Sequence, residues 1–479
     1  MLWLALYFPQ LPLEVFVRGR QQAGALAVVE QAGGREQVSR CNAAALAYGI
    51  RPGISLPAAL ALCDGLSVQL REPARERQAL DELALWAYQF SSGIGFEPSL
   101  LLLEVGASQR LFGGLPALLQ ILQAELEQLG YSAQHALAPT PAAAGLLARN
   151  LPGCRVLSEQ QLRDAVGGLP LSRLSRDDNV RSLMRHIGLD SIADALALPR
   201  PELSRRTGPQ LPALLDRLLG LAPDPRPQWQ PPKYFSQVIE LLGEIEQVTA
   251  LVFPAHRLMV ALCGFLRGQG GGVQRLHWRL LHRDQPETHF GQGLLDPSRD
   301  PDHMLEVFRE RIERLQLPAP VVAVGLRVQD WQAFEERNLG LLDTPVSADH
   351  ALLERLSNRL GDQRVRGLRC LADHRPERAW RWCDPGESSD VVTGSGRQPG
   401  QTQPPWLLPQ PRPLSEHRGQ PQYGGVLRLE SLPQRIEAGW WDGFDITRDY
   451  FVAHSPAGER LWVFRDRRGG GWYLHGLFV

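Results

Sequence analysis

The chain has 479 residues, which is too long for one ordinary folding unit and indicates several domains. Hydrophobic residues make up 43% of the sequence, so a wholly disordered chain is excluded and sizeable cores are expected. The 51 basic and 52 acidic residues give a formal net charge of -1, so any nucleic-acid contact must come from local clusters of charge.

The first 165 residues alternate the patterns of buried strands and amphipathic helices. The apolar runs LWLALYF, from Leu2, and SLLLLEVGA, from Ser99, predict central strands that are buried on both faces. Thr140 and Pro141 predict an N-cap and a first helical residue. We therefore expect a mixed α/β domain over residues 1–165, with a fingers-like part at about 22–72.

The remaining segments change pattern several times. Residues 166–230 predict short helices around a glycine hinge, followed by a Pro-rich linker. Residues 231–335 predict the order strand, helix, strand, strand, helix, strand. Beyond a short segment at 336–345 we expect a helical region over 346–385, a disordered linker over 386–425 and a compact, aromatic-rich β module over 426–479.

The apolar N-terminus is interpreted as a strand and not as a signal peptide. It lacks a basic region and a small-residue cleavage site, and Pro9 and Pro12 interrupt it. The six cysteines are scattered without metal-ligand spacing, as expected for a reducing compartment. Both features predict a cytoplasmic protein.

The order of these modules resembles the palm, fingers, thumb and little finger of Y-family (translesion) DNA polymerases. NAAALAYGIRPGISLPAALALC, from Asn42, is similar to their fingers motif, and LLLEVGASQRLFGG is similar to a palm strand and the helix after it. HALAPTPAAAGLLARN is similar to a third family segment. The resemblance covers about residues 1–340 and implies a multidomain α/β and α+β fold with Y-family polymerase architecture.

The two ends of the chain narrow the resemblance to the ImuB-type subfamily. Leu2 to Glu14 resembles the opening of those proteins, and Gly439 to Phe478 resembles their ending. The resemblance implies an inactive polymerase relative that acts with a RecA-like partner (ImuA) and an error-prone DnaE-type polymerase. Their shared task would be damage-induced (SOS) mutagenesis.

The carboxylates that polymerisation needs are missing. Two-metal chemistry requires two or three carboxylates that hold Mg²⁺ at one point. Alignment with active members puts Tyr7 and Pro9 at the Asp positions of the first strand, and Ser99 and Leu100 at the Asp-Glu pair before the second. The resemblance therefore implies a degenerate catalytic site and no bound cofactor.

The triphosphate contacts of the family are also missing. Ala43 and Leu46 stand where active members carry a tyrosine and an arginine, and Pro141 and Gly145 stand where they carry lysines. Lys233 is the only lysine of the chain, so none precedes it. A rival interpretation stays open, in which Glu97 or Glu14 supplies a relocated metal ligand and the chain is an active polymerase that uses Mg²⁺.

Contacts with DNA are expected in two regions. The turn Ile187-Gly188-Leu189 fits a helix–hairpin–helix that holds phosphates, although an ordinary helical hairpin is the alternative. Arginines on strand-like stretches of the little finger would contact phosphates in a salt-sensitive way, unless they form a solvated sheet face. They are Arg267, Arg275, Arg279, Arg283 and Arg327.

Two further segments suggest protein partners. A degenerate sliding-clamp peptide is predicted at Asn338, Leu339, Gly340, Leu341 and Leu342, with a plain loop as the alternative. The tail carries six aromatic residues that form either its own core or a docking surface: Trp440, Trp441, Tyr450, Phe451, Trp462 and Trp472. His475 is interpreted as a structural histidine.

These features predict a non-catalytic scaffold in translesion synthesis that binds DNA and the sliding clamp (beta subunit). It would recruit the ImuA/RecA-like protein and the DnaE-type polymerase through its C-terminal region. The rivals are an active Y-family polymerase with relocated metal ligands and a DNA-binding regulator that does not contact the clamp.

Overall fold

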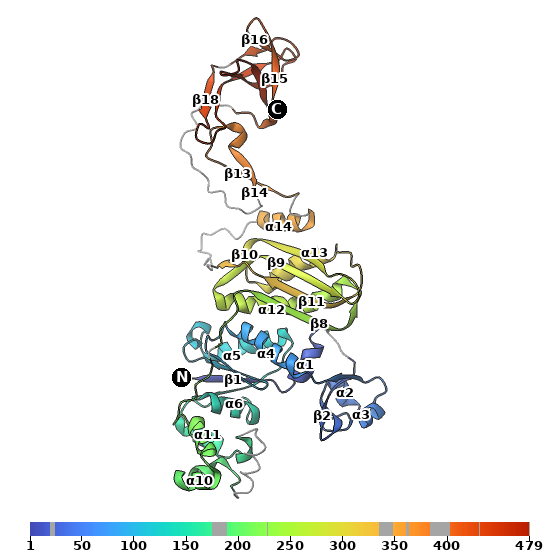
Figure 1. Ribbon diagram of the computed structural model, residues 1–479, viewed down its shortest axis with the longest axis vertical. Helices are drawn as coiled ribbons and strands as arrows, with labels where there is room; N and C mark the ends of the chain where they lie inside the picture. The colour runs from blue at the N-terminus through green and yellow to red at the C-terminus, as the bar shows by residue number, and fades with distance from the viewer. Residues whose placement is uncertain are drawn as a thin grey trace. The chain divides into compact units, whose positions relative to one another are not determined.

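A computed structural model describes residues 1–19, 24–174, 189–227, 229–334, 348–360, 364–383, 403–430 and 432–478. The chain separates into two compact units, Met1–Ser347 and Ala348–Val479, whose elements are labelled in Figure 1.

The palm region (residues 1–19 and 72–150) is built on a four-stranded sheet of order β5-β6-β1-β7. Leu4, Ala5 and Leu6 are fully buried, which confirms the predicted strand with two covered faces. Leu4 and Leu6 pack toward α4 and α5, whereas Ala5 packs toward α6 on the other face. The elements are β1 (Trp3–Tyr7), α1 (Leu11–Val17), α4 (Pro73–Ala87), β5 (Ile94–Glu97), β6 (Leu100–Glu104), η1 (Gln109–Phe112), α5 (Leu115–Leu129), β7 (Gln134–Ala138) and α6 (Pro141–Asn150).

The fingers region (residues 24–71) is a small three-stranded sheet with two short helices. Its strands run in the order β3-β2-β4, and the pair β2–β4 is parallel. One face of its sheet has a core of its own, and Leu26 and Val28 of β2 pack against Leu13 and Phe16 of α1. The elements are β2 (Leu26–Ala32), β3 (Arg35–Cys41), α2 (Ala43–Ala47), α3 (Leu56–Leu62) and β4 (Ser67–Leu70).

The thumb region (residues 151–174 and 189–220) consists of helices that share one core with α6. Thr140 caps α6 by accepting a hydrogen bond from the Ala143 N–H, and Pro141 begins the helix, as predicted. The elements are α7 (Glu159–Gly167), η2 (Leu171–Arg173), α9 (Ile192–Ala197), α10 (Arg200–Thr207) and α11 (Gln210–Leu219).

The little-finger region (residues 231–334) has the predicted order of strand, helix, strand, strand, helix, strand. Its main sheet runs β10-β9-β11-β8, and its two long helices pack on one face. The elements are β8 (Phe235–Ile245), η3 (Val248–Leu251), α12 (Val252–Gln269), β9 (Gly271–His282), β10 (Thr288–Ser298), α13 (Pro301–Ile312), β11 (Val321–Val328) and β12 (Gln332–Ala333).

Helix α12 joins the little-finger and palm regions into one hydrophobic core. Leu4 and Trp86 of the palm region belong to the same buried cluster as Phe265 and Trp278 of the little-finger region. A Cβ atom on Gly264 would lie 2.5 Å from Trp86 Cδ1, so the glycine permits the close approach of α12 to α4. Among the described helices, the stretch Val248–Gln269 alone is long and apolar enough to cross a membrane, and 61% of its most apolar window is buried inside this core.

The second unit is mainly a seven-stranded sheet, with a separate two-stranded hairpin (Figure 1). The predicted helical region contains α14 and the short 3-10 helix η4, but β13 and β14 form that hairpin within it. The prediction of a disordered linker does not hold for residues 403–425, where β15 pairs with β21. The elements are α14 (Ala348–Leu360), β13 (Gly367–Cys370), η4 (Pro376–Arg378), β14 (Trp380–Cys383), β15 (Trp406–His417), β16 (Gln420–Gln422), β17 (Arg428–Leu429), β18 (Gln434–Ala438), β19 (Ile446–His454), β20 (Arg460–Asp466) and β21 (Trp472–Phe478).

Candidate functional site

The four positions predicted as degenerate metal ligands meet at one end of the palm sheet. Tyr7 is the direct partner of Leu100 across the β1–β6 pair. The N–H of Phe8 donates to the carbonyl of Ser99 at 2.8 Å, which brings the turn before β6 beside the end of β1. Pro9 follows directly. The fold therefore gathers these positions at one point, as a metal site requires, but their side chains supply no carboxylate.

Glu97 is the acidic side chain next to this point, and guanidinium groups neutralise it. Its Oε1 accepts a hydrogen bond from Arg226 Nη1 at 3.0 Å, and its Oε2 lies 2.8 Å from Arg149 Nη2. Arg226 also binds Asp224 at 2.7 Å. Both oxygens of Glu97 thus face cations, in a cluster of two arginines and two acids that we call the Glu97 ion-pair cluster.

The cluster extends toward Tyr7 and Gly145. The guanidinium carbon of Arg149 lies 5.7 Å from the centre of the Tyr7 ring. A Cβ atom on Gly145 would lie 3.7 Å from Glu97 Oε2, so the small residue leaves space for the carboxylate. In the part of the chain that the structure describes, no three His, Cys, Asp or Glu residues converge as metal ligands.

Glu14, the other acid weighed as a relocated ligand, is engaged elsewhere. Its Oε1 accepts hydrogen bonds from the N–H of Ser132, at 2.9 Å, and from the Ser132 hydroxyl. Burial raises the pKa of this carboxyl to about 7, although the Ser132 bonds and the charges of Arg18 and Arg257 oppose the shift. The group is a buried structural acid and not a partner of the Glu97 ion-pair cluster.

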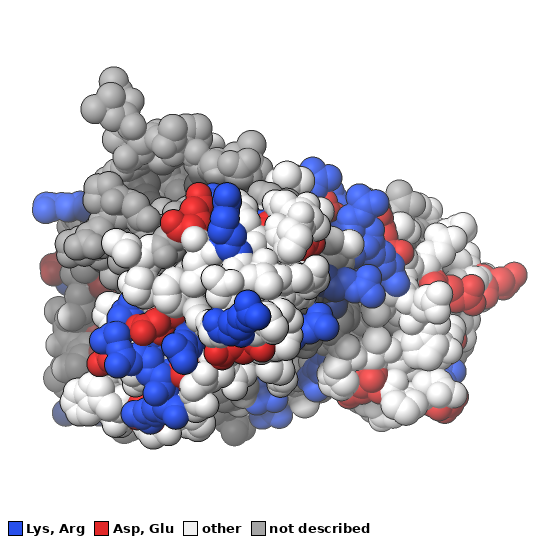
Figure 2. Space-filling view, turned by 90° about the horizontal axis from the view of Figure 1, so that it is seen from above, with Lys and Arg blue, Asp and Glu red and all other residues white. Residues whose placement is uncertain are grey.

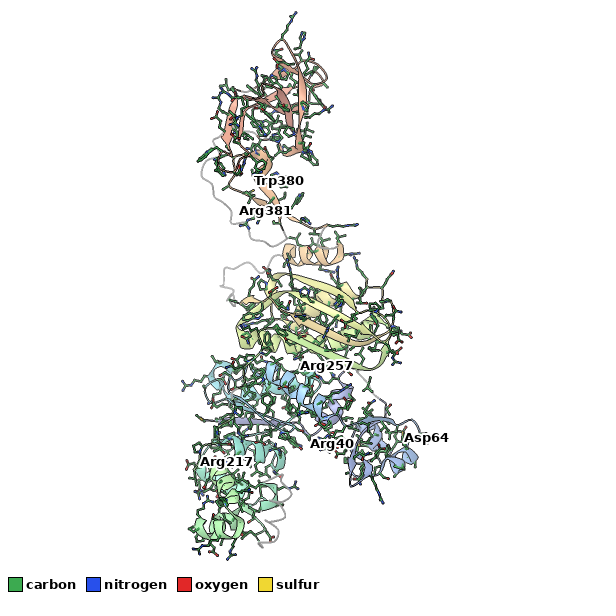
Figure 3. The ribbon with its side chains drawn as sticks, viewed as in Figure 1. Arg40, Asp64, Arg217, Arg257, Trp380 and Arg381 are labelled. Atoms are coloured by element: carbon green, nitrogen blue, oxygen red, sulfur yellow. The ribbon has the colours of Figure 1, made fainter. Side chains whose placement is uncertain are left out.

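The positions expected to hold a triphosphate offer no cation of their own. Ala43 and Leu46 lie exposed on α2, and Pro141 is buried in the first turn of α6. A basic residue that sequence reasoning missed, Arg40 of β3, lies between fingers and palm and is labelled in Figure 3. Its Nε donates to the carbonyl of Pro9 at 2.7 Å, so it ties the two regions together.

The open face of the little-finger sheet carries a basic row. Arg275, His277 and Arg279 alternate along β9 with buried residues, so they lie on the face opposite α12 and α13. Arg327 of β11 is the direct partner of His277. Arg279 lies across Gly325, where a Cβ atom would approach its side chain to 2.7 Å. These four residues are called the little-finger basic row.

Two of the predicted DNA contacts are used differently. Arg267 lies on helix α12 and not on a strand, and its guanidinium binds Glu125 of α5 at 2.5 Å. It therefore belongs to the junction with the palm region, and its predicted place on a strand is wrong. Arg283 is exposed and pairs with Glu244 at 3.1 Å.

Several predicted residues fall outside the described part of the chain. They are Ile187 and Gly188 of the thumb turn, and the clamp peptide Asn338, Leu339, Gly340, Leu341 and Leu342. Leu189, the last residue of that turn, packs against the thumb core.

The aromatic residues of the tail divide between core and surface. Tyr450 and Trp462 stack at 4.1 Å between ring centres, and the Tyr450 hydroxyl lies 2.8 Å from Nδ1 of buried His475. Burial lowers the pKa of His475 to about 4, as expected for a structural histidine. Trp440 and Trp441 are 80% and 57% exposed, so they belong to the surface.

Basic and acidic side chains lie close together on one face of the molecule. On the face drawn in Figure 2, Lys and Arg side chains form several clusters, and Asp and Glu side chains lie beside many of them. On this face, basic side chains are therefore interleaved with acidic ones and do not form one continuous basic surface.

Comparisons with known proteins point to one family. The family model described as the impB/mucB/samB family (IMS) matches residues 17–149. Proteins named Protein ImuB from two strains of Caulobacter vibrioides are 26% identical over 464 residues, covering 90% of this chain and 100% of their own.

Solved structures of polymerases are also similar. The insertion ternary complex of Dbh DNA polymerase is 15% identical with a TM-score of 0.38, covering 68% of this chain and 98% of that one. The crystal structure of DinB from Sulfolobus solfataricus is 15% identical with a TM-score of 0.35, covering 70% and 100%. The family model thus covers Ser99 and Leu100 but not Tyr7 and Pro9, and the similarity to proteins named ImuB extends over 90% of this chain, so the chain is similar to ImuB-type proteins along most of its length.

Proposed function

We propose that the chain is a non-catalytic scaffold in damage-induced translesion synthesis. In this role it binds DNA and the sliding clamp, and it brings an ImuA/RecA-like protein and an error-prone DnaE-type polymerase to the lesion. The cytoplasm is its expected location. The proposal assigns the polymerase frame to positioning and assigns nucleotide transfer to a partner.

The Glu97 ion-pair cluster is the observation that carries the proposal. A two-metal site needs carboxylate oxygens that are free to bind Mg²⁺. At the gathered strand ends the nearest acid has Arg149 at one oxygen and Arg226 at the other. Two guanidinium groups beside one carboxylate repel a divalent cation, so the cluster disfavours metal binding.

The little-finger basic row supports binding to DNA without base reading. Arginines and a histidine on an open sheet face suit contacts with phosphates, which give affinity that falls as salt rises. The row lies opposite the helices that join the little-finger and palm regions, so the junction leaves it accessible. The proposed contacts with the clamp and with the partner proteins are supported by the sequence and by the resemblance.

Primer extension tests the proposal directly. The purified chain should add no nucleotides to a primed template with Mg²⁺ or Mn²⁺, because the gathered strand ends supply no free carboxylate. An active Y-family polymerase on the same substrate is the positive control. Nucleotide addition by the wild-type chain that disappears in Glu97→Gln would establish the rival, an active polymerase with a relocated ligand.

A further inference from the structure

The C-terminal unit carries a short segment with an unusual excess of arginine. Residues 364–383 contain six arginines and two acidic residues, a local formal charge of +4, in a chain whose net charge is -1. The same segment contains Trp380 and Trp382. Basic residues interleaved with aromatic ones are the pattern of nucleic-acid contacts.

The segment folds as the β13–β14 hairpin, which has two chemically different faces. Leu368 is the direct partner of Trp382, and Arg369 is the direct partner of Arg381. Because successive residues of a strand point to opposite faces, Trp380 and Trp382 share one face, and Arg369 and Arg381 share the other. We call the first of these the indole face.

The indole face is open to solvent. Trp380 is 40% exposed and Trp382 is 56% exposed, with ring centres 5.6 Å apart and ring planes at 88°. Leu368, on the same face, is 61% exposed. An uncovered two-stranded hairpin is only marginally stable in water, and exposed apolar faces of this kind mark contact sites.

The other face of the hairpin carries positive charge from Arg369 and Arg381. Arg369 and Arg381 lie directly opposite each other on the paired strands, so this face gathers like charges. Within the described residues, no carboxylate pairs with Arg381, which is labelled with Trp380 in Figure 3. Arg366 is exposed and two residues before Leu368, which places it at the end of the indole face if the chain stays extended.

A buried ion pair fixes the base of the hairpin to the main sheet of the unit. Arg375 is 3% exposed and binds Asp373 at 2.6 Å and Asp442 at 2.8 Å. Its Nη1 also donates to the carbonyl of Phe444 at 3.1 Å. Asp442 and Phe444 belong to the loop between β18 and β19, so the indole face is held in place before any ligand arrives.

We propose that the indole face is a binding site for single-stranded DNA. The exposed indoles stack on unpaired bases, which their perpendicular ring planes keep apart from each other, and Arg366 at the end of the same face contacts a phosphate of the strand. Stacking suits a single strand because its bases are unpaired, whereas a duplex hides the base faces. The site is separate from the little-finger basic row, and it stands whether or not the chain polymerises DNA.

The test measures the full chain against labelled oligothymidylate by fluorescence anisotropy over a series of salt concentrations. The double variant Trp380→Ala/Trp382→Ala should bind at least about tenfold more weakly, since each stacked base contributes strongly to affinity. Trp380→Phe/Trp382→Phe keeps stacking rings and should restore most of the affinity. Arg366→Gln should reduce the slope of log affinity against log salt by about 0.7, the value for one lost phosphate contact on a single strand.

The matched control removes another exposed tryptophan pair of the same unit. Trp440 and Trp441 also have ring centres 5.6 Å apart, with ring planes at 84°. Trp440→Ala/Trp441→Ala should leave oligothymidylate affinity unchanged, and blunt duplex DNA should bind the hairpin variant as it binds wild type. Unchanged oligothymidylate affinity in the hairpin variant, or equal losses in the control, overturns the proposal. If the hairpin variant kept its affinity for DNA but no longer bound a partner protein, the hairpin would be a protein-docking site instead.

Discussion

Glu14 illustrates how one buried carboxyl links the palm and little-finger regions. The acid packs near Arg18, which directly follows α1, and near Arg257 of α12, and only one of its oxygens has hydrogen-bond donors among the described residues. Arg257, labelled in Figure 3, reaches the carbonyl of Arg18, and burial lowers its pKa to about 10. A protonated carboxyl suits this environment better than a carboxylate.

Unfolding of the first unit should therefore depend on pH through Glu14. The pKa of Glu14 is about 7 in the folded state and close to 4.5 in the unfolded state. Protonated Glu14 therefore contributes its full stabilisation below pH 4.5, and this contribution is lost as the pH rises from 4.5 through 7. The loss amounts to roughly 3 kcal/mol at most. Urea unfolding between pH 5 and pH 8 should show a smaller pH dependence for Glu14→Gln than for wild type.

The exposed glutamate Glu127 of α5 provides the control for this measurement. Glu127→Gln should keep the wild-type dependence on pH. If Glu14→Gln retained the full dependence as well, another group would be responsible, and Glu14 would be ionised in the folded protein.

At the scale of the element, the little-finger basic row leads to a quantitative prediction about the affinity for DNA. Replacing Arg275, Arg279 and Arg327 by alanine should weaken duplex binding and lower the slope of log affinity against log salt by about 0.9 for each lost phosphate contact. Electrophoretic mobility shifts on unrelated duplex sequences should show the same loss, because phosphate contacts do not read bases.

Three arginines at the end of α13 in the little-finger region provide the control variant, because replacing them removes the same number of charges. Arg309 and Arg311 lie in the last turn of α13, and Arg314 follows it. Their triple alanine variant should keep the wild-type salt slope. Equal slopes for the two triple variants would remove the basic row as a DNA contact.

At the scale of the whole molecule, the sequence predicts elements better than it predicts their partners. Continuous apolar runs identify buried strands, as in β1, because burial on both faces requires them. Arg267 shows the limit, since a charged residue in the sequence does not reveal the Glu125 carboxylate that pairs with it across the fold. The alignment of Tyr7, Ser99 and Leu100 was predictable, but the arginines around Glu97 come from distant segments.

The strand β15 shows a second limit. Prolines cannot donate to a sheet ladder, so a Pro-rich stretch predicts an irregular or disordered chain. Here Pro409 and Pro411 fall where the register with β21 shifts between Leu407 and Arg412, and the ladder resumes beyond it. A register shift of this kind depends on the neighbouring strand, so the local amino-acid composition does not predict it.

The predicted contact with the sliding clamp also concerns the whole molecule. Leu341→Ala with Leu342→Ala should abolish retention of the chain on immobilised sliding clamp, because the two leucines are the apolar anchors of the predicted peptide. Leu352→Ala with Leu353→Ala, an exposed leucine pair on α14 with the same chemistry, should be retained like wild type. Wild-type retention of both variants would place the clamp contact elsewhere.

The packing of α12 against α4 and α5 has a mechanical consequence. Because Phe265 and Trp86 lie in one core, the polypeptide connection between the regions is not what keeps them together. A proteolytic nick near residues 222–227 would leave a single particle, and two separately produced fragments should reassemble. A version truncated before β8 would instead expose Trp86 and aggregate, so within the first unit the palm region depends on the little-finger region for its folded state.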